Sequence, residues 1–139
     1  MPSAEHTVTI RRPVGEVFAF IENHENDPRW RAGVLDIKRG SGNSWQQGMK
    51  GPLGRRIAGD FDVTQNEPNR RHAFHVTAGP VQPDGVYELA DENGSTRVTF
   101  SLRADLDGAK KLMAPLVART MKQEVGALDR LKTVLESGG

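Results

Sequence analysis

Hydrophobic residues alternate with polar ones at the start of the chain and then change to a helical spacing. Val8 and Ile10 share one face of the segment 5–12, while polar residues share the other, which predicts a half-buried strand. Pro13 suits the first position of a helix, where its missing N–H is no loss. The apolar residues that follow recur at three- and four-residue spacing, and this stripe predicts a short helix over residues 13–22.

A second, shorter helix and another strand are predicted next. Asp27 and Pro28 resemble a helix cap and a first-turn proline, so we expect a very short helix that begins at Asp27 and runs through Trp30. Gly33 ends it. Alternation returns over residues 34–39 and predicts a strand.

Residues 45–106 contain strand-like runs separated by turn residues and show no helical period. The clearest turn signal lies at residues 91–94, where the sequence DENG predicts a hairpin. The cleanest alternation of the chain follows this turn, and it places five apolar side chains on one face of a strand: Val98, Phe100, Leu102, Ala104 and Leu106.

The last segment, residues 109–136, has the pattern of one long amphipathic helix. Pro115 lies about two turns inside it and removes a backbone hydrogen bond, so we expect the first turns to be irregular. The predicted apolar stripe consists of Leu112, Leu116, Val117, Met121, Val125, Leu128, Leu131 and Leu135.

The predicted order is one strand, two short helices, several strands and one long helix. Strands that are grouped together, with helices segregated from them, indicate an α+β fold with an antiparallel sheet of about seven strands. The long helix covers one face of such a sheet and leaves the other to solvent, in agreement with the alternation. We expect a single domain over residues 1–139, which is an ordinary length for one domain.

Composition narrows the classes of function. Nineteen basic and eighteen acidic residues give a net charge of +1, so we expect no nucleic acid as a partner. The absence of cysteine excludes disulfides, thiolate nucleophiles and cysteine-ligated zinc. Apolar runs fall far short of the ~20 residues that span a bilayer, and the chain does not open with a basic and then an apolar segment. We therefore expect a cytoplasmic protein without a membrane span.

Several local motifs, in their order along the chain, resemble the polyketide cyclase/dehydrase family. This family belongs to the START/birch-pollen-allergen-like (SRPBCC) superfamily of helix-grip proteins. Residues 8–21 (VTIRRPVGEVFAFI) resemble its first strand, proline and helix, and residues 26–30 (NDPRW) resemble its short helix ending in tryptophan. Residues 94–100 (GSTRVTF) resemble its last strand, and residues 128–136 resemble the end of its long helix. The resemblance covers about residues 5–136.

The resemblance implies a helix-grip fold, in which a curved antiparallel sheet wraps around the long C-terminal helix and the concave space between them forms a cavity. A concave apolar cavity is the usual site for a small molecule. We expect the protein to bind a small, largely apolar molecule there, either aromatic, polyketide-like or lipid, without a cofactor, as a monomer or homodimer. One alternative is an enzyme of the polyketide cyclase or dehydratase type that uses an acid or base in the cavity. Another alternative is a protein-interaction or regulatory partner.

His72 is the candidate catalytic residue. Strand parity puts it on the same face as Phe74, toward the interior, where a neutral imidazole can act as an acid or base near pH 7. The alternative is a histidine at the rim of the sheet that is bonded to water. His75 has the opposite parity and is expected to face solvent, while His24 lies in a loop and receives little weight.

The other candidate ligand-binding residues are apolar or aromatic, with one cation. Trp30 either stacks on a flat ligand or packs in the core, and the Tyr87 hydroxyl needs a partner if it is buried. Arg55, or Arg56 if the register slips, is expected to pair with an anionic group of a ligand, or else to be solvated. The remaining candidates are Phe61, Phe74, Phe100, Met113, Val117 and Met121. No hydrolase elbow, phosphate-binding glycine loop or zinc-protease motif is present, and we expect no metal site.

Overall fold

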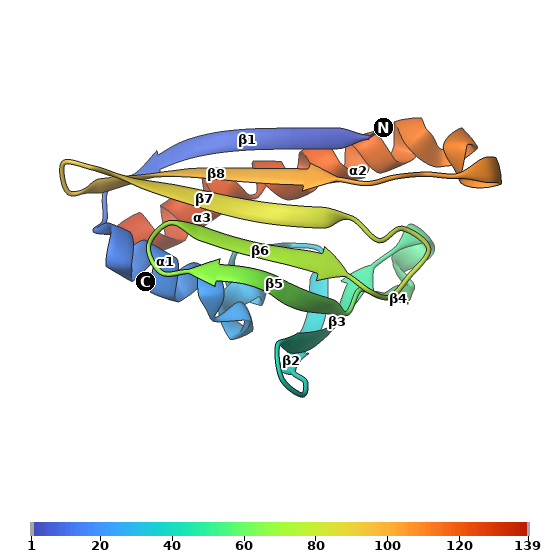
Figure 1. The fold of residues 1–139 in the computed structure, drawn as a ribbon, viewed down its shortest axis with the longest axis horizontal. Coiled ribbons are helices and arrows are strands. Elements are labelled where there is room, and N and C mark those ends of the chain that lie inside the picture. Colours follow the sequence, from blue (N-terminus) through green and yellow to red (C-terminus); the bar gives the residue numbers. More distant parts are fainter. Residues whose placement is uncertain (1, 139) are drawn as a thin grey trace.

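A computed structural model describes residues 2–138 and shows one antiparallel sheet with helices along one face (Figure 1). The strand order across the sheet is β1-β8-β7-β6-β5-β3-β2, and the short β4 pairs with β3 beside this path. The strands are β1 (Ser3–Ile10), β2 (Val34–Arg39), β3 (Ser44–Lys50), β4 (Arg56–Ala58), β5 (Phe61–Glu67), β6 (Arg71–Val76), β7 (Asp84–Glu92) and β8 (Ser95–Arg103).

The helices lie between β1 and β2 in the sequence, beside β4, and after β8. Those named η are 3-10 helices, which have three residues per turn. The helices are α1 (Val14–Glu22), η1 (His24–Arg29), η2 (Pro52–Gly54), η3 (Gly108–Met113), α2 (Ala114–Gly126) and α3 (Leu128–Glu136). The predicted α+β helix-grip arrangement is confirmed, with α2 and α3 packed along β1. None of the helices in residues 2–138 combines the length and apolar character that crossing a membrane requires.

The β7–β8 hairpin contributes alternating buried side chains to the core. Asn93 and Gly94 both have positive φ, of 56° and 93°, which is the conformation that a two-residue hairpin turn requires. In β8 the predicted alternation is confirmed, because Val98, Phe100 and Leu102 are all buried. The register of β8 against both β1 and β7 therefore fixes which side chains face the helices.

The long helical segment at the C-terminal end is confirmed, but it is not continuous. It divides into η3, α2 and α3, and α2 begins with Pro115 in its first turn, where a proline costs no hydrogen bond. Since a 3-10 helix turns by three residues and an α-helix by 3.6, the apolar stripe does not continue across the junction. Leu112 in η3 is therefore 87% exposed, although it was predicted to be buried. Leu116, also predicted to be buried, is 58% exposed because it lies in α2 away from the face that Val117, Met121 and Val125 bury. The stripe holds from Val117 onward.

The end of α3 is tied to the end of β1. The Glu136 carboxylate accepts hydrogen bonds from the Arg11 backbone N–H at 2.8 Å and from Lys132 Nζ at 2.9 Å. These bonds hold the pKa of Glu136 down at about 2. The C-terminal helix is therefore anchored at its far end, next to the start of α1.

Candidate functional site

Aromatic side chains fill the space between the sheet and the helices. Tyr87 and Phe100, on the neighbouring strands β7 and β8, are stacked with their ring centroids 4.2 Å apart. Phe74 on β6 lies 5.4 Å from Phe61 on β5 and 6.1 Å from Tyr87. Trp30 closes the cluster with its ring edge toward Tyr87, at 6.2 Å. The interior is therefore lined by the flat faces and edges of aromatic rings, and its polar groups lie at the end near η1.

The structure brings most of the predicted residues to this interior. Met113 is half-buried, and eight others are buried: Trp30, Phe61, His72, Phe74, Tyr87, Phe100, Val117 and Met121. Arg55 is exposed and lies just before β4, so its side chain is not part of this interior, in agreement with the alternative of a solvated arginine. Arg56 does not replace it, since its side chain binds Asp36 on the surface. The buried arginine of the protein is Arg31, 8% exposed, in the loop between η1 and β2.

The short helix η1 delivers three more polar or aromatic groups to the interior. Its cap is Asn23, whose side chain accepts a hydrogen bond from the Glu25 backbone N–H, so the prediction of Asp27 as the cap was wrong. Asp27 lies inside η1 and is completely buried. His24, which received little weight in the sequence, is 1% exposed. Because 3-10 positions three residues apart align on one face, His24 and Asp27 point the same way, and the buried Trp30 follows as the residue that ends η1.

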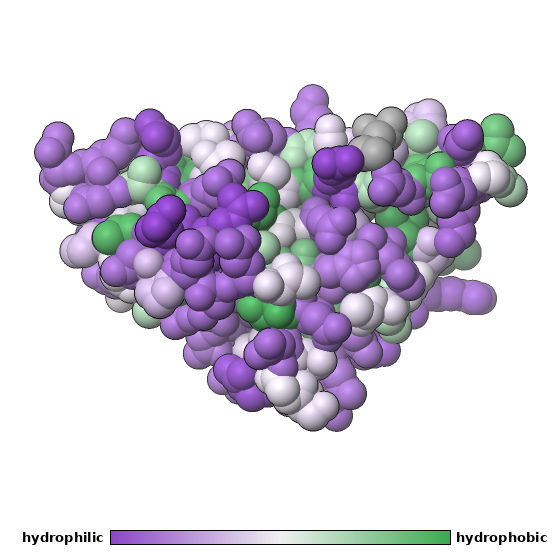
Figure 2. All heavy atoms as spheres, viewed as in Figure 1, coloured by the Kyte–Doolittle hydropathy of each residue, from purple (hydrophilic) through white to green (hydrophobic). Residues whose placement is uncertain are grey.

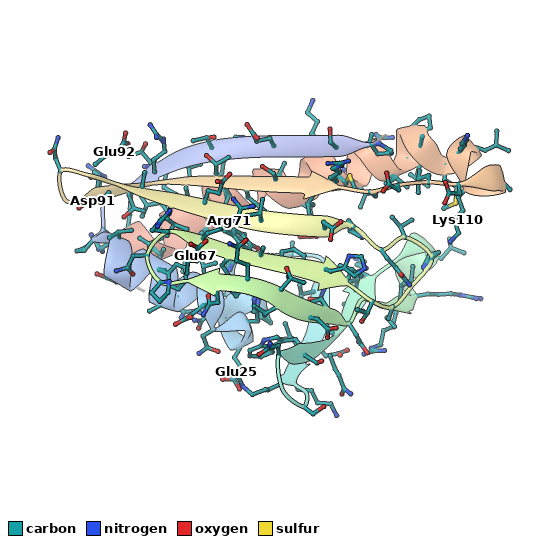
Figure 3. The ribbon with its side chains drawn as sticks, in the orientation of Figure 1. Glu25, Glu67, Arg71, Asp91, Glu92 and Lys110 are labelled. Atoms are coloured by element: carbon teal, nitrogen blue, oxygen red, sulfur yellow. The ribbon has the colours of Figure 1, made fainter. Side chains whose placement is uncertain are left out.

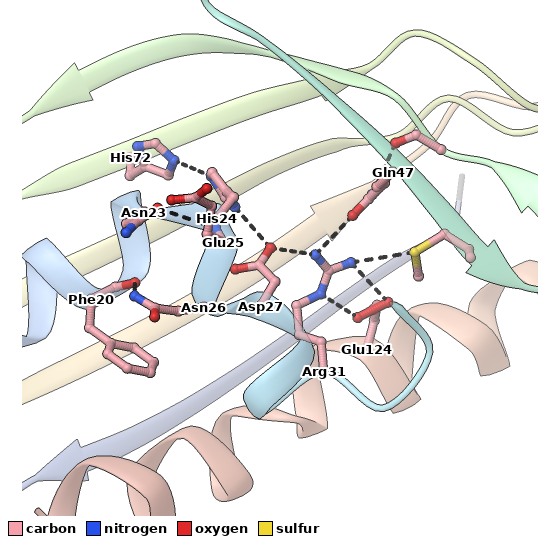
Figure 4. A network of polar contacts seen from close by, with 12 residues as sticks. Phe20, Asn23, His24, Glu25, Asn26, Asp27, Arg31, Gln47, His72 and Glu124 are labelled. Carbon is pink, nitrogen blue, oxygen red and sulfur yellow. Dashed lines mark hydrogen bonds and ion pairs between the residues drawn. The ribbon is translucent and has the colours of Figure 1, made fainter. Parts of the chain in front are cut away.

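His72 is hydrogen-bonded at both ring nitrogens. Its Nε2 lies 2.8 Å from Nε2 of His24 (Figure 4), and its Nδ1 lies 2.9 Å from Oδ1 of Asn66. The other nitrogen of His24, Nδ1, lies 2.9 Å from Oδ2 of Asp27. The chain of contacts Asn66–His72–His24–Asp27 therefore runs from strand β5 through β6 into η1.

Arg31 extends this chain to the C-terminal helix. Its Nη1 donates to Asp27 Oδ2 at 2.8 Å and to Gln47 Oε1 at 3.3 Å, and its Nε donates to Glu124 Oε1 at 3.0 Å (Figure 4). Burial opposes the charged form of Arg31, but Glu124 and Asp27 together hold its pKa above the ordinary value. We call the group Asn66, His72, His24, Asp27, Arg31, Gln47 and Glu124 the buried polar network. It links the sheet, η1 and α2.

The hydrogen-bond directions in the network fix where its proton lies. Asn66 Nδ2 donates to Glu22, which turns the Asn66 carbonyl oxygen toward His72, so His72 Nδ1 must be the donor. A neutral His72 then accepts at Nε2 from His24. Since the Asp27 carboxylate accepts from the other nitrogen of His24, His24 carries hydrogens on both nitrogens and is an imidazolium.

This assignment balances the buried charges. The cations Arg31 and His24 face the anions Asp27 and Glu124, so the network as a whole is neutral. Burial, together with the charge on His24, lowers the pKa of His72 to about 4, and His72 is therefore neutral near pH 7. Burial also raises the pKa of Tyr87 well above its ordinary value, so its hydroxyl keeps its proton.

Two buried polar atoms at the interior have no partner in the protein. Oδ1 of Asp27 and Nε1 of Trp30 make no hydrogen bond to any group in residues 2–138. Leaving such a group unpaired costs about 1–3 kcal/mol, which is why most buried polar atoms are paired. One atom is an acceptor and the other a donor; Asp27 lies inside η1, and Trp30 is the residue that ends it.

The hollows that stand out on the described residues lie on the outside of the molecule. One, of about 670 Å³, is a shallow depression along the outer side of α3, lined by Asp129, Arg130, Thr133, Val134, Ser137 and Gly138. The other, of about 250 Å³, lies over strands β6, β7 and β8. Neither lies between the sheet and α2, where the aromatic rings and the polar network are packed together. Among residues 2–138, no group of three or more histidine, aspartate or glutamate side chains is placed to hold a metal ion.

Sequence reasoning missed His24, Arg31, Gln47 and Glu124 as parts of this site. The strands reveal inward-facing residues through parity, as with His72, but a short 3-10 helix and the loop after it have no such pattern. Two patterns in the sequence point to these residues: His24, Asp27 and Trp30 are three residues apart, and Gln47 shares one face of β3 with Trp45.

Comparisons with known proteins show which solved structures share this fold and which family the chain matches. Its backbone is similar to TTHA0849 from Thermus thermophilus, with 18% identity, a TM-score of 0.80 and coverage of 99% of this chain and 100% of that one. It is also similar to a START superfamily protein from Mycobacterium smegmatis, with 14% identity, a TM-score of 0.68 and coverage of 97% and 94%.

A third similar structure is the di-domain ARO/CYC BexL from the BE-7585A biosynthetic pathway. It is 17% identical, with a TM-score of 0.77, and the match covers all of this chain and 48% of BexL. A search of curated proteins found no match. The profile of the family described as polyketide cyclase / dehydrase and lipid transport matches residues 1–136. The chain therefore belongs to the polyketide cyclase / dehydrase and lipid transport family.

Proposed function

We propose that the protein holds a small, uncharged aromatic molecule with a hydroxyl group, such as a phenol or a cyclised polyketide, between its sheet and its C-terminal helices. The observation that carries this proposal is the pair of unpartnered buried atoms, Asp27 Oδ1 and Trp30 Nε1, beside a cluster of aromatic rings. A hydroxyl group donates one hydrogen bond and accepts another, so its chemistry suits an acceptor such as Asp27 Oδ1 and a donor such as Trp30 Nε1. Stacked and edge-on rings accommodate a flat ligand.

The charges of the network favour an uncharged ligand over a carboxylate. Arg31 already binds the carboxylates of Asp27 and Glu124, so it is not available to a third anion. An anionic ligand at Trp30 would also lie close to the Asp27 carboxylate, and like charges in a buried site repel strongly. Fatty acids are therefore poorer candidates than neutral aromatic alcohols.

The ligand enters when α2 and the sheet separate. Aromatic rings occupy the interior, so a bound molecule must displace some of their packing. The contact between Arg31 and Glu124 joins the η1 loop to α2 across this boundary. The family description and the ARO/CYC label of BexL support a polyketide-like aromatic ligand, because the whole chain shares that fold.

Binding is tested with β-naphthol, β-naphthoate and naphthalene by calorimetry and thermal shift. We expect β-naphthol to bind and to raise the melting temperature by mass action, and β-naphthoate to bind at least about tenfold more weakly. Trp30→Phe should lower the affinity for β-naphthol about three- to tenfold, as expected for one hydrogen bond.

Trp45→Phe is the matched control, because Trp45 is also buried but packs against His24 and under Arg39. It should leave the preference for β-naphthol over naphthalene unchanged. Equal affinity for β-naphthol and naphthalene would refute the hydroxyl site and leave an apolar pocket. No binding of any of the three compounds would refute the pocket as well.

A second candidate function is acid–base catalysis of the cyclase or dehydratase type, and the contact between Asp27 and His24 favours it. A carboxylate that orients an imidazolium is a common arrangement for a general acid, and His24 carries the transferable proton here. His72 is a weaker choice for the base than the sequence predicted, since its pKa of about 4 is far from neutrality.

The enzyme hypothesis is tested with a phenyl-substituted β-hydroxy ketone, whose loss of water gives a strongly absorbing conjugated enone. We expect His24→Gln to abolish dehydration by the protein while β-naphthol still binds. Dehydration that continues at the native rate in His24→Gln would contradict an acid role for this residue. His75→Gln, which alters an exposed histidine paired with Asp84, is the control.

A further inference from the structure

Two segments far apart in the sequence combine exposed leucines with basic residues. Residues 50–56 (KGPLGRR) contain three basic and no acidic residues, and residues 108–122 (GAKKLMAPLVARTMK) contain four basic and no acidic residues. The whole chain has a net charge of only +1, so the remaining residues carry a net charge of −6. Positive charge is therefore concentrated in these two segments.

Each segment holds leucine side chains out into solvent. Leu53, at the middle of η2, is 95% exposed and has a φ of 59°, a left-handed conformation that is unusual for a leucine. Leu112 and Leu116, four residues apart where η3 joins α2, are 87% and 58% exposed. These are three of the four large hydrophobic side chains found exposed in residues 2–138, and the fourth is Leu35.

Both segments lie toward the same end of the molecule. Figure 1 shows η2 with β4, and η3 with the start of α2, at one end of the long axis. Figure 3 places Lys110 at this end, and Figure 2 shows hydrophobic surface beside hydrophilic side chains there. We call this region the leucine–lysine end, and it consists of Leu53, Leu112 and Leu116 with Lys50, Arg55, Arg56, Lys110 and Lys111. Two further cations, Arg119 and Lys122, follow along α2.

Most of its cations have no anionic partner. Arg56 pairs with Asp36, but no ion pair to Lys50, Arg55, Lys110, Lys111, Arg119 or Lys122 is present among the side chains that the structure describes. Unpaired cations with long, flexible stems attract an anionic surface without requiring a fixed geometry.

From this combination we propose that the leucine–lysine end docks on an anionic lipid bilayer. Lysine and arginine bind the anionic headgroups, while separate leucines insert into the boundary between headgroups and acyl chains. A protein partner fits less well, because protein interfaces have a closed apolar core and are depleted in lysine. The proposal does not depend on the ligand site, which lies in the interior.

The test is sedimentation of the protein with vesicles of phosphatidylcholine alone and of phosphatidylcholine mixed with phosphatidylserine. We expect binding to the mixed vesicles, weaker binding as salt rises, and little binding to phosphatidylcholine alone. The double variant Lys110→Ser and Lys111→Ser should lose about 30-fold in affinity, since each basic residue near an anionic surface contributes about fivefold.

The leucines are tested with Leu53→Ser and Leu112→Ser, each of which should weaken binding to the mixed vesicles. Both side chains are exposed, so the fold should survive, and circular dichroism verifies this. Leu35→Ser is the comparison variant: Leu35 is 48% exposed on the edge strand β2, next to Asp36, whose carboxylate pairs with Arg56, so its replacement should weaken binding less than that of Leu53. No sedimentation with the mixed vesicles, or an equal effect of Leu35→Ser and Leu53→Ser, overturns the proposal.

Discussion

Replacing Arg31 with methionine is expected to lower the free energy of unfolding by about 3–5 kcal/mol, because it removes one member of a buried ion-pair network. The carboxylates of Asp27 and Glu124 would remain, with only His24 to balance them. Methionine matches much of the volume of arginine but offers no hydrogen-bond donor to either carboxylate. Urea denaturation followed by circular dichroism measures the loss.

The matched control is Arg56→Met. Arg56 binds Asp36 through two hydrogen bonds of 2.9 Å, a better geometry than that of many buried pairs, but both side chains are exposed. Water solvates both ions when the pair is broken, so the loss of stability should be far smaller than for Arg31→Met. Similar losses in the two variants would mean that the Arg31 network is hydrated and not truly buried.

The contribution of the buried polar network to stability is distinct from its role in specifying the fold. Buried ion pairs seldom stabilise more than apolar residues of the same size, since desolvation offsets most of their attraction. The network joins β5, β6, η1 and α2 through directional bonds, so it specifies one arrangement of these elements rather than adding much net stability. An interior built for packing alone would not leave Asp27 Oδ1 and Trp30 Nε1 without partners.

The sequence predicted the sheet well because strand parity is a direct readout of burial. Alternation placed Phe74, Tyr87 and Phe100 on the inner face, and the structure confirms that all three are buried. The motif order also predicted the family correctly, since strand, proline, helix and tryptophan follow one another at the family's spacing. These features depend on local periodicity, which one sequence is enough to show.

The polar half of the site could not be predicted in the same way. Whether Arg31 or Arg55 turns inward depends on how η1 and β4 pack on the sheet, and no periodic pattern covers either segment. The same limit explains Leu112, which matches a helical stripe in the sequence but lies in η3, where the change of helix type rotates it outward from the buried face of α2. Local periodicity therefore predicts the faces of long elements and fails at short ones.

Lowering the pH from 7 to 4 is expected to reduce the stability of the protein by about 3 kcal/mol through His72 alone. The pKa of this histidine is about 4 in the folded protein and 6.5 in the unfolded chain. Between these values the unfolded chain binds a proton that the folded protein does not, so stability is full above pH 6.5 and falls as the pH approaches 4. The physical cause is burial next to the His24 imidazolium, which leaves no room for a second positive charge.

The measurement is the free energy of unfolding in urea at a series of pH values for the native protein and for His72→Gln. Glutamine keeps a hydrogen-bonding side chain that does not titrate, so the variant should be less stable at pH 7 but should lose less stability between pH 7 and pH 4. Subtracting the two curves removes the contribution of the carboxylates that titrate in both proteins.

His75→Gln serves as the control, because His75 is at the surface and pairs with Asp84, so its curve should follow that of the native protein. Parallel curves for the native protein and His72→Gln would show that His72 is already protonated or solvated in the folded state. A protonated His72 would place the shared proton on His72 instead of His24 and would reverse only the His24–His72 hydrogen bond, because His72 would still donate to Asn66 and His24 to Asp27.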